Sequence, residues 1–299
     1  MRRHLAQLNV ATLRHPIDDP RIADFANALP TVNGAGEQSP GYVWRLQSDS
    51  GDATDIQVFD DPLIIVNLTV WESLEALKPF AYRGLHRDFF RRRGEWFVEG
   101  STRTALWWLP AGTLPTTDEA KRRLDFIEVF GSSPYAFAMG QNHPPLVIEH
   151  VGLDDDRATG LIRQLNDDLD HTGDSHRSFR LGPDDIGEGR GCLVVAELDD
   201  APVAFGAYRR TDDASAEIQR MYVAQSARGI RVGAAIIAEL EAAATQGGLQ
   251  RMLLETWPRQ LPLLEQFGFR PCPCWGDHIA STTSICLEKA LPAEPSRLA

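Results

Sequence analysis

Residues 219–246 read QRMYVAQSARGIRVGAAIIAELEAAATQ, and this stretch decides the fold of the second half of the chain. It starts as a short apolar segment and passes through a polar turn at 225–231. After the turn, Val232, Ile236 and Leu240 recur at helical spacing among alanines, which favour helix. The pattern therefore predicts a strand, a turn and a helix in succession.

The turn has the composition of an anion-binding site. The first amides of a helix have no intrahelical partner and carry the positive end of its dipole. Gly229 and Gly233 have no side chains that would keep a phosphate from these amides, and Arg228 and Arg231 add positive charge and several donors. An exposed turn without a ligand can have the same composition, so both interpretations remain open on the residues alone.

Segments around this turn resemble the GNAT acetyltransferase family. AEIQRMYVAQSARGIRVGAAII (216–237) is similar to the family's central motif, and EQFGFRPCPCWGD (265–277) and SICLEKAL (284–291) are similar to its later segments. The resemblance covers residues 146–291 and implies a mixed α/β acyl-CoA-binding domain that uses acetyl-CoA. The cofactor-binding residues that it implies are Met221, Tyr222, Val223, Arg228, Gly229, Ile230, Arg231, Val232, Gly233 and Ala234. Arg231 stands where the family has a glycine, which predicts a different backbone path or a side-chain clamp on the pyrophosphate.

Glu217 is the candidate catalytic base. Acetyl transfer to an amine requires that the ammonium lose a proton, and the GNAT resemblance implies this role for a glutamate at this position. Alternation along the strand would place Glu217 and Met221 on one face unless a bulge intervenes. The alternative is an exposed strand carboxylate paired with Arg209 or Arg210.

The general acid of the family has no counterpart here. The family commonly has a tyrosine shortly before its Gly-Phe pair, and Leu264 occupies that position. The thiolate then leaves unaided, or another donor serves, for which Tyr222 and Cys274 are the candidates. A domain that binds acyl-CoA without turnover is the further alternative.

The acceptor amine cannot be identified from the sequence, but its side of the cleft has candidates. Asp170, His171 and His176 lie on a polar segment that caps the acceptor cleft in similar folds. Clustered acidic residues suit a cationic acceptor, and a solvated loop is the alternative. The two histidines have no recognised metal-ligand spacing, so no metal is expected.

The first half of the chain carries a second resemblance. HLAQLNVA (4–11), NLTVWESLEALKPFAYRGLHRDFFRRRGEWF (67–97) and ALWWLPAGTLPTTDEAKRRL (105–124) resemble the DUF3291 family. This resemblance implies a ferredoxin-like dimeric α/β-barrel domain and a homodimer formed through it, with helices expected on one sheet face. A pocket for a planar apolar ligand could be lined by Trp71, His86 and Trp107, whereas core and interface positions are the alternative for the tryptophans.

Composition bounds the partners and the compartment. A net charge of −12 argues against nucleic acid, which requires a basic face. No apolar run reaches membrane-spanning length and no apolar segment follows Met1, so a cytoplasmic protein without membrane contact is expected. The cysteines show no zinc-ligand pattern and are expected to be small, buried or half-buried free thiols: Cys192, Cys272, Cys274 and Cys286.

The sequence therefore predicts an α+β protein of two domains. Residues 1–141 are the DUF3291-like domain and 146–292 the GNAT domain. The linker between them is 142–145, which ends in two consecutive prolines, and 293–299 form a tail. The predicted function is transfer of acetyl from acetyl-CoA to the amine of a small molecule in a ternary complex. The alternatives are a non-catalytic acyl-CoA sensor, and an oxygenase-like activity in the N-terminal domain.

Overall fold

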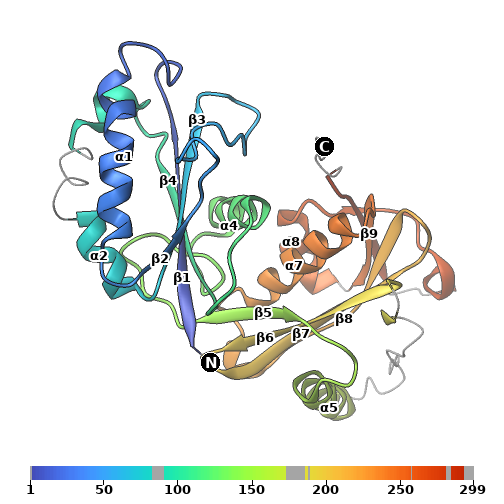
Figure 1. The fold of residues 1–299 in the computed structure, drawn as a ribbon. Helices are drawn as coiled ribbons and strands as arrows, with labels where there is room; N and C mark the ends of the chain where they lie inside the picture. Colours follow the sequence, from blue (N-terminus) through green and yellow to red (C-terminus); the bar gives the residue numbers. More distant parts are fainter. Residues whose placement is uncertain are drawn as a thin grey trace. The chain divides into compact units, whose positions relative to one another are not determined.

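The computed structural model describes residues 2–82, 91–172, 186–187, 189–256, 258–280 and 284–292, without the side chains at 170–172, 259, 277 and 280. The chain divides into two compact units, Met1–Val147 and Ile148–Ala299 (Figure 1). Each unit is built on a sheet of its own, with helices packed against it. No described helix is both long enough and apolar enough to cross a membrane.

The described part of the N-terminal unit forms a four-stranded sheet in the order β2-β3-β1-β4, with every neighbouring pair antiparallel. A helical segment separates β1 from β2, and another separates β3 from β4. This β-α-β-β-α-β connectivity is consistent with a ferredoxin-like unit. The elements in chain order are β1 (Arg3–Thr12), α1 (Ala23–Glu37), β2 (Tyr42–Arg45), β3 (Ile64–Trp71), α2 (Leu74–Tyr82), β4 (Arg103–Pro110) and α4 (Thr117–Phe130).

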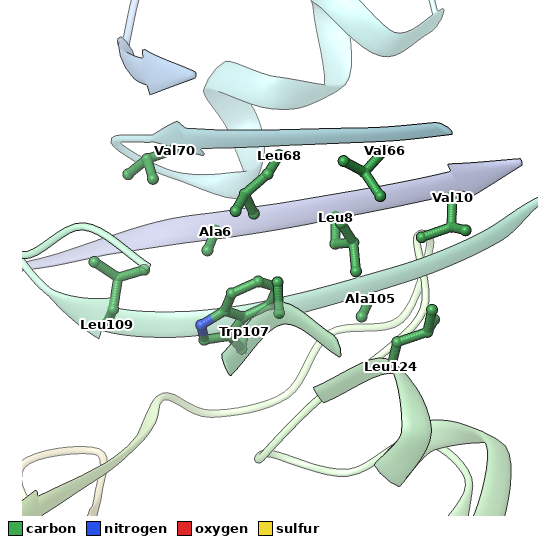
Figure 2. Packing of buried hydrophobic residues seen from close by; sticks show 11 residues of the cluster. Ala6, Leu8, Val10, Val66, Leu68, Val70, Ala105, Trp107, Leu109 and Leu124 are labelled. Carbon is green, nitrogen blue, oxygen red and sulfur yellow. The ribbon is translucent and has the colours of Figure 1, made fainter. Parts of the chain in front are cut away.

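Helices cover both faces of this sheet, so the expectation of helices on one face is wrong. Alternation along β1 sends Ala6 and Leu8 to the face where α4 packs, and Figure 2 shows this cluster with Leu124 of α4 beside it. Leu5 points to the opposite face, where it meets Leu74 and Leu77. The physical reason is that both strands carry some apolar residues at odd as well as even positions, such as Leu5 in β1 and Trp71 in β3, so each face has apolar surface to bury.

The two tryptophans of the predicted pocket lie on opposite faces of the sheet. Trp107 belongs to the cluster under α4, and Trp71 belongs to the cluster under α2. Both are fully buried, at 0% exposed. They therefore belong to the core, as the alternative held, and do not line one pocket. His86 lies outside the described residues.

The C-terminal unit carries a seven-stranded sheet in the order β10-β11-β9-β8-β7-β6-β5. Its central strands β8 and β9 run parallel because α7 crosses over between them, and β6 to β8 form an antiparallel meander. The elements are β5 (Leu146–His150), α5 (Asp156–Thr172), β6 (Gly191–Leu198), β7 (Ala201–Arg210), β8 (Ser215–Val223), η2 (Gln225–Ala227), α7 (Val232–Gln246), β9 (Arg251–Thr256), η3 (Pro258–Gln260), α8 (Leu261–Gln266), β10 (Arg270–Pro271), η4 (Gly276–Ala280) and β11 (Ile285–Ala290).

The two long helices of this unit pack on opposite faces of its sheet. Leu161 of α5 packs with Phe205 and Tyr222 on one face. On the other face, α7 lies so close to β7 that a Cβ built on Gly206 would be 2.3 Å from Cγ2 of Ile236. A glycine inside a strand often marks a site where another element comes close to the backbone, and at Gly206 that element is α7.

Candidate functional site

A β-bulge in β8 changes which side chains share a face. Ile218 pairs with Tyr208 of β7 and Arg220 pairs with Ala207, so Gln219 is the extra residue. Glu217 consequently points to the α5 side of the sheet, and Met221 points to the α7 side, where it faces Gly206. The exception that the sequence left open, a bulge between Glu217 and Met221, is therefore the case, and the two side chains do not share a face.

The parallel strands β8 and β9 separate after a short paired stretch. Their pairing runs from Ser215 with Arg251 to Ile218 with Leu254, and beyond it the described part of β8 pairs only with β7. The amide of Ala224 donates to the carbonyl of Val203, so the preceding residue, Val223, directs its own N–H and C=O away from β7. Because strand residues two positions apart have the same orientation, Met221 also directs its N–H and C=O away from β7. The strand thus has an edge at which an extended ligand can add backbone hydrogen bonds.

The N-terminus of α7 follows this edge and has no capping side chain. The residue before the helix, Arg231, has φ 67° and ψ 20° in the left-handed region, and its carbonyl accepts from the amide of Ala235. Among the described residues, no side chain at the N-cap accepts a hydrogen bond from the first amides of the helix. Gly229 also has a positive φ of 83°. The turn therefore keeps the amides of Val232, Gly233 and Ala234 available to an anion.

An ion pair links this turn to α5. The guanidinium of Arg228 donates to Oδ2 of Asp168 at 3.3 Å and, through Nε, to the carbonyl of Val223 at 2.9 Å. The hydroxyl of Tyr222 donates to the same Oδ2 at 3.2 Å. Burial raises the pKa of Tyr222, and the bond to Asp168 raises it further, so this phenol is a protonated donor that is already engaged.

Glu217 is buried and both of its carboxylate oxygens have partners. The residue is 2% exposed. Oε2 accepts from Nη2 of Arg209 at 3.1 Å and from Nε at 3.3 Å, and Oε1 lies 2.9 Å from Nε2 of His278. The alternative to a catalytic role was an exposed carboxylate paired with Arg209 or Arg210. The pair with Arg209 is present, but the carboxylate is buried.

Sequence reasoning missed His278. The histidine lies in η4, 61 residues from Glu217, and a single histidine on a polar segment has no spacing that connects it to a carboxylate on another strand. The ring of Trp275 meets its ring edge-on, with centroids 5.4 Å apart. A histidine shortly after a Gly-Phe pair is the one signal that could have drawn attention to this segment.

A disulfide closes the segment that carries His278. Cys274 is bonded to Cys286 of β11, so the expectation of free thiols is wrong for these two residues, whereas Cys192 and Cys272 are free. Because its sulfur is in a disulfide, Cys274 cannot supply the proton for the leaving thiolate. The bond ties the segment before η4 to a strand of the central sheet.

A second feature of this unit is a cavity of about 650 Å³, lined in part by His150, Cys192 and Tyr208. The sulfur of Cys192 lies 3.3 Å from Nδ1 of His150. Burial raises the pKa of Cys192 to about 12, so this thiol stays protonated and is a poor nucleophile.

The predicted acceptor residues cannot be placed with the rest of the site. The structure describes the backbone of Asp170 and His171 at the end of α5 without their side chains, and His176 lies outside the described residues. Among the residues that were described, no three His, Cys, Asp or Glu side chains are grouped as a metal site would need.

Comparisons with known proteins match the two units to two families. Residues 4–151 match the domain of unknown function DUF3291, and residues 159–269 match the acetyltransferase (GNAT) family. A DUF3291 domain and a GNAT acetyltransferase domain are therefore both present in the chain. No curated protein matches it.

Solved structures similar to this chain include three acetyltransferases. The acetyltransferase from Streptococcus agalactiae is 17% identical over 49% of this chain and 98% of its own, with a TM-score of 0.41. A GNAT family acetyltransferase from Elizabethkingia anophelis, solved with acetyl-CoA bound, is 17% identical over 49% and 98%, with a TM-score of 0.35. The ribosomal-protein-S18-alanine N-acetyltransferase from Escherichia coli is 15% identical over 52% and 99%, with a TM-score of 0.38.

Proposed function

We propose that this chain, which carries a GNAT acetyltransferase domain after a DUF3291 domain, is an N-acetyltransferase. It transfers the acetyl group of acetyl-CoA to the amine of a small molecule, directly and in a ternary complex. The observation that supports this function best is the separation of β8 from β9 after Ile218, immediately before the uncapped N-terminus of α7. An extended strand edge next to an anion site matches a pantetheine arm that ends in a pyrophosphate.

The residues around the turn fit acetyl-CoA. A Cβ on Gly229 would meet nothing within 4 Å, and a Cβ on Gly233 would meet only Cγ2 of Val223 at 3.5 Å, so neither glycine is crowded by other atoms. We assign the pyrophosphate to the amides of 232–234 with Arg228 and Arg231 beside them, and the pantetheine arm to the edge of Met221–Val223. Arg228 would have to leave the carbonyl of Val223 for that edge to be used.

We assign the proton transfer to the buried carboxylate of Glu217 and its partners. Bringing the amine and the thioester together accounts for much of the barrier lowering, and removing a proton from the ammonium accounts for a further part. The acceptor residues that we propose are Asp170, His171 and His176, of which the first two belong to the last turn of α5. Leu264 is buried at the position of the family's tyrosine, so the thiolate departs without a proton from that position.

The test of this function is release of free thiol from acetyl-CoA across a panel of small amines. Amine-dependent release by the full chain, with the acetylated amine detected by mass spectrometry, is the expected result. Binding of acetyl-CoA without release for any amine would contradict the enzyme and leave the acyl-CoA sensor as the better description.

We also propose that the chain forms a homodimer through its DUF3291 domain. The edge strand β2 supports this proposal, because among the described residues it pairs only with β3 and it carries the exposed Val43. Sedimentation velocity of the full chain over a range of concentrations should show a dimer. A monomer at every concentration would contradict this proposal.

A further inference from the structure

We propose that His278 is the catalytic base of the GNAT domain and that Glu217 acts through it as a positioning residue. This inference rests on the proposed N-acetyltransferase function and names the group that takes the proton of the amine. It differs from the assignment of Glu217 as the direct base, because the substrate would contact the imidazole and not the carboxylate.

The accessibility of the two side chains supports this order. The side chain of Glu217 is 3% exposed, whereas that of His278 is 18% exposed. Oε2 of the glutamate is taken by Arg209 and Oε1 by His278, so no carboxylate oxygen is without a partner. An amine that approaches from solvent therefore meets the more exposed imidazole first, and it cannot bind the carboxylate without breaking one of these bonds.

The hydrogen bond determines which ring nitrogen can accept a proton. A carboxylate that already accepts from a guanidinium has only acceptor oxygens to offer, so Nε2–H of His278 donates to Oε1 across the 2.9 Å contact. The neutral imidazole then carries a lone pair on Nδ1. No hydrogen bond to Nδ1 is found among the described residues. A buried carboxylate behind one ring nitrogen and a free lone pair on the other is the arrangement that makes histidine an effective base.

The surroundings hold this pair beside the point where the strands separate. Glu217 pairs with Leu253 of β9, one residue before the last pair of the β8–β9 ladder. The rings of Trp275 and His278 meet edge-on, and the disulfide of Cys274 anchors the same segment to β11. Among the described residues, the charged group that contacts the imidazole is Glu217 on β8, which in turn pairs with Arg209 on β7. The base is thus held from two sides, and its partner Glu217 lies on the strand that leads to the proposed acetyl-CoA edge.

The chemical step balances without any further reactant. Nδ1 of His278 accepts one proton from the ammonium, and the neutral nitrogen attacks the thioester carbonyl to form the new C–N bond. The C–S bond breaks and its electron pair leaves on sulfur. The nitrogen loses its second proton, which neutralises the thiolate, and the imidazolium returns its proton to solvent.

The variant His278→Gln tests this assignment. Its amide N–H₂ replaces Nε2 as the donor to Glu217, but the side chain cannot accept a proton. We expect kcat/KM at neutral pH to fall by about 10²–10⁴-fold. The loss should be much smaller for an amine that is already neutral at the assay pH, and the rate of the variant should rise with pH as the amine deprotonates in bulk. An unchanged rise in melting temperature with acetyl-CoA shows that the variant is folded and binds.

The variant Glu217→Gln and the double variant separate the two assignments. If Glu217 acts through His278, the double variant loses no more than His278→Gln alone, because the two residues act as a unit. A wild-type rate and pH profile in His278→Gln, together with a large loss in Glu217→Gln, would overturn this inference and restore Glu217 as the direct base. Absence of turnover in the wild type with every amine would instead contradict the proposed function itself.

Discussion

Gly233→Glu is expected to abolish the rise in melting temperature that acetyl-CoA causes in the wild-type protein. A ligand that binds only the native state stabilises it by about 2.7 kcal/mol at 100 times its Kd. A Cβ at position 233 meets only Val223 at an ordinary contact distance, so the variant can fold. Its carboxylate would lie at the uncapped amides of α7 and compete there with the pyrophosphate. Thermal unfolding with and without millimolar acetyl-CoA measures the effect.

Gly233→Ala and Arg231→Gly are the matched controls. The alanine adds the same Cβ without charge and should keep most of the shift. Arg231 has a left-handed backbone that costs about 1–2 kcal/mol for a residue other than glycine, so Arg231→Gly should raise the melting temperature without ligand. A smaller rise in melting temperature with acetyl-CoA in Arg231→Gly than in the wild type would indicate that the guanidinium of Arg231 binds the pyrophosphate. An undiminished shift in Gly233→Glu would remove this turn from the cofactor site.

Gly206→Ala is expected to lower the stability of the C-terminal unit by about 1–3 kcal/mol, because extra volume in a packed core forces side chains and backbone to move. The new Cβ would lie 2.3 Å from Cγ2 of Ile236 and 3.1 Å from Cδ1 of Leu240. Both residues are fully buried, so neither can turn towards solvent. Chemical denaturation of the full chain, followed by a probe in the C-terminal unit, measures the loss.

Gly160→Ala is the control for this prediction. It makes the same chemical change within α5, where a Cβ would meet nothing within 4 Å, and alanine is the better helix former, so a small gain is expected. Ile236→Leu removes the clashing Cγ2, and the double variant should recover part of the loss caused by Gly206→Ala. Equal stabilities of Gly206→Ala and the wild type would show that α7 does not pack closely on β7.

Much of the local structure was predicted correctly from the sequence. The strand, turn and helix of 219–246 appear as β8, η2 and α7. The start of α4 also follows from local sequence, because Thr116 precedes the helix and its hydroxyl accepts from the amide of Glu119 at 3.1 Å. The turn between β6 and β7 falls at Asp199 and Asp200, both with positive φ. Each of these features depends on residues within a few positions of one another.

The candidate site was only partly predictable. The residues of the acetyl-CoA turn are contiguous, so one motif was enough to name them. Glu217 was named as well, but its face was left conditional on a bulge, and a single extra residue, Gln219, puts it on the face opposite Met221. No local pattern signals that bulge, since it results from how β8 fits against β7.

The sequence by itself determined the two domains' families, the order of most strands and helices, and the composition of the anion-binding turn. Tertiary structure alone decided that Glu217 meets His278, that Cys274 is joined to Cys286, and that Trp71 and Trp107 lie on opposite faces of one sheet. The reason is physical: backbone conformation follows from side chains a few residues apart, whereas strand register and contacts between distant segments follow from the packing of the whole unit.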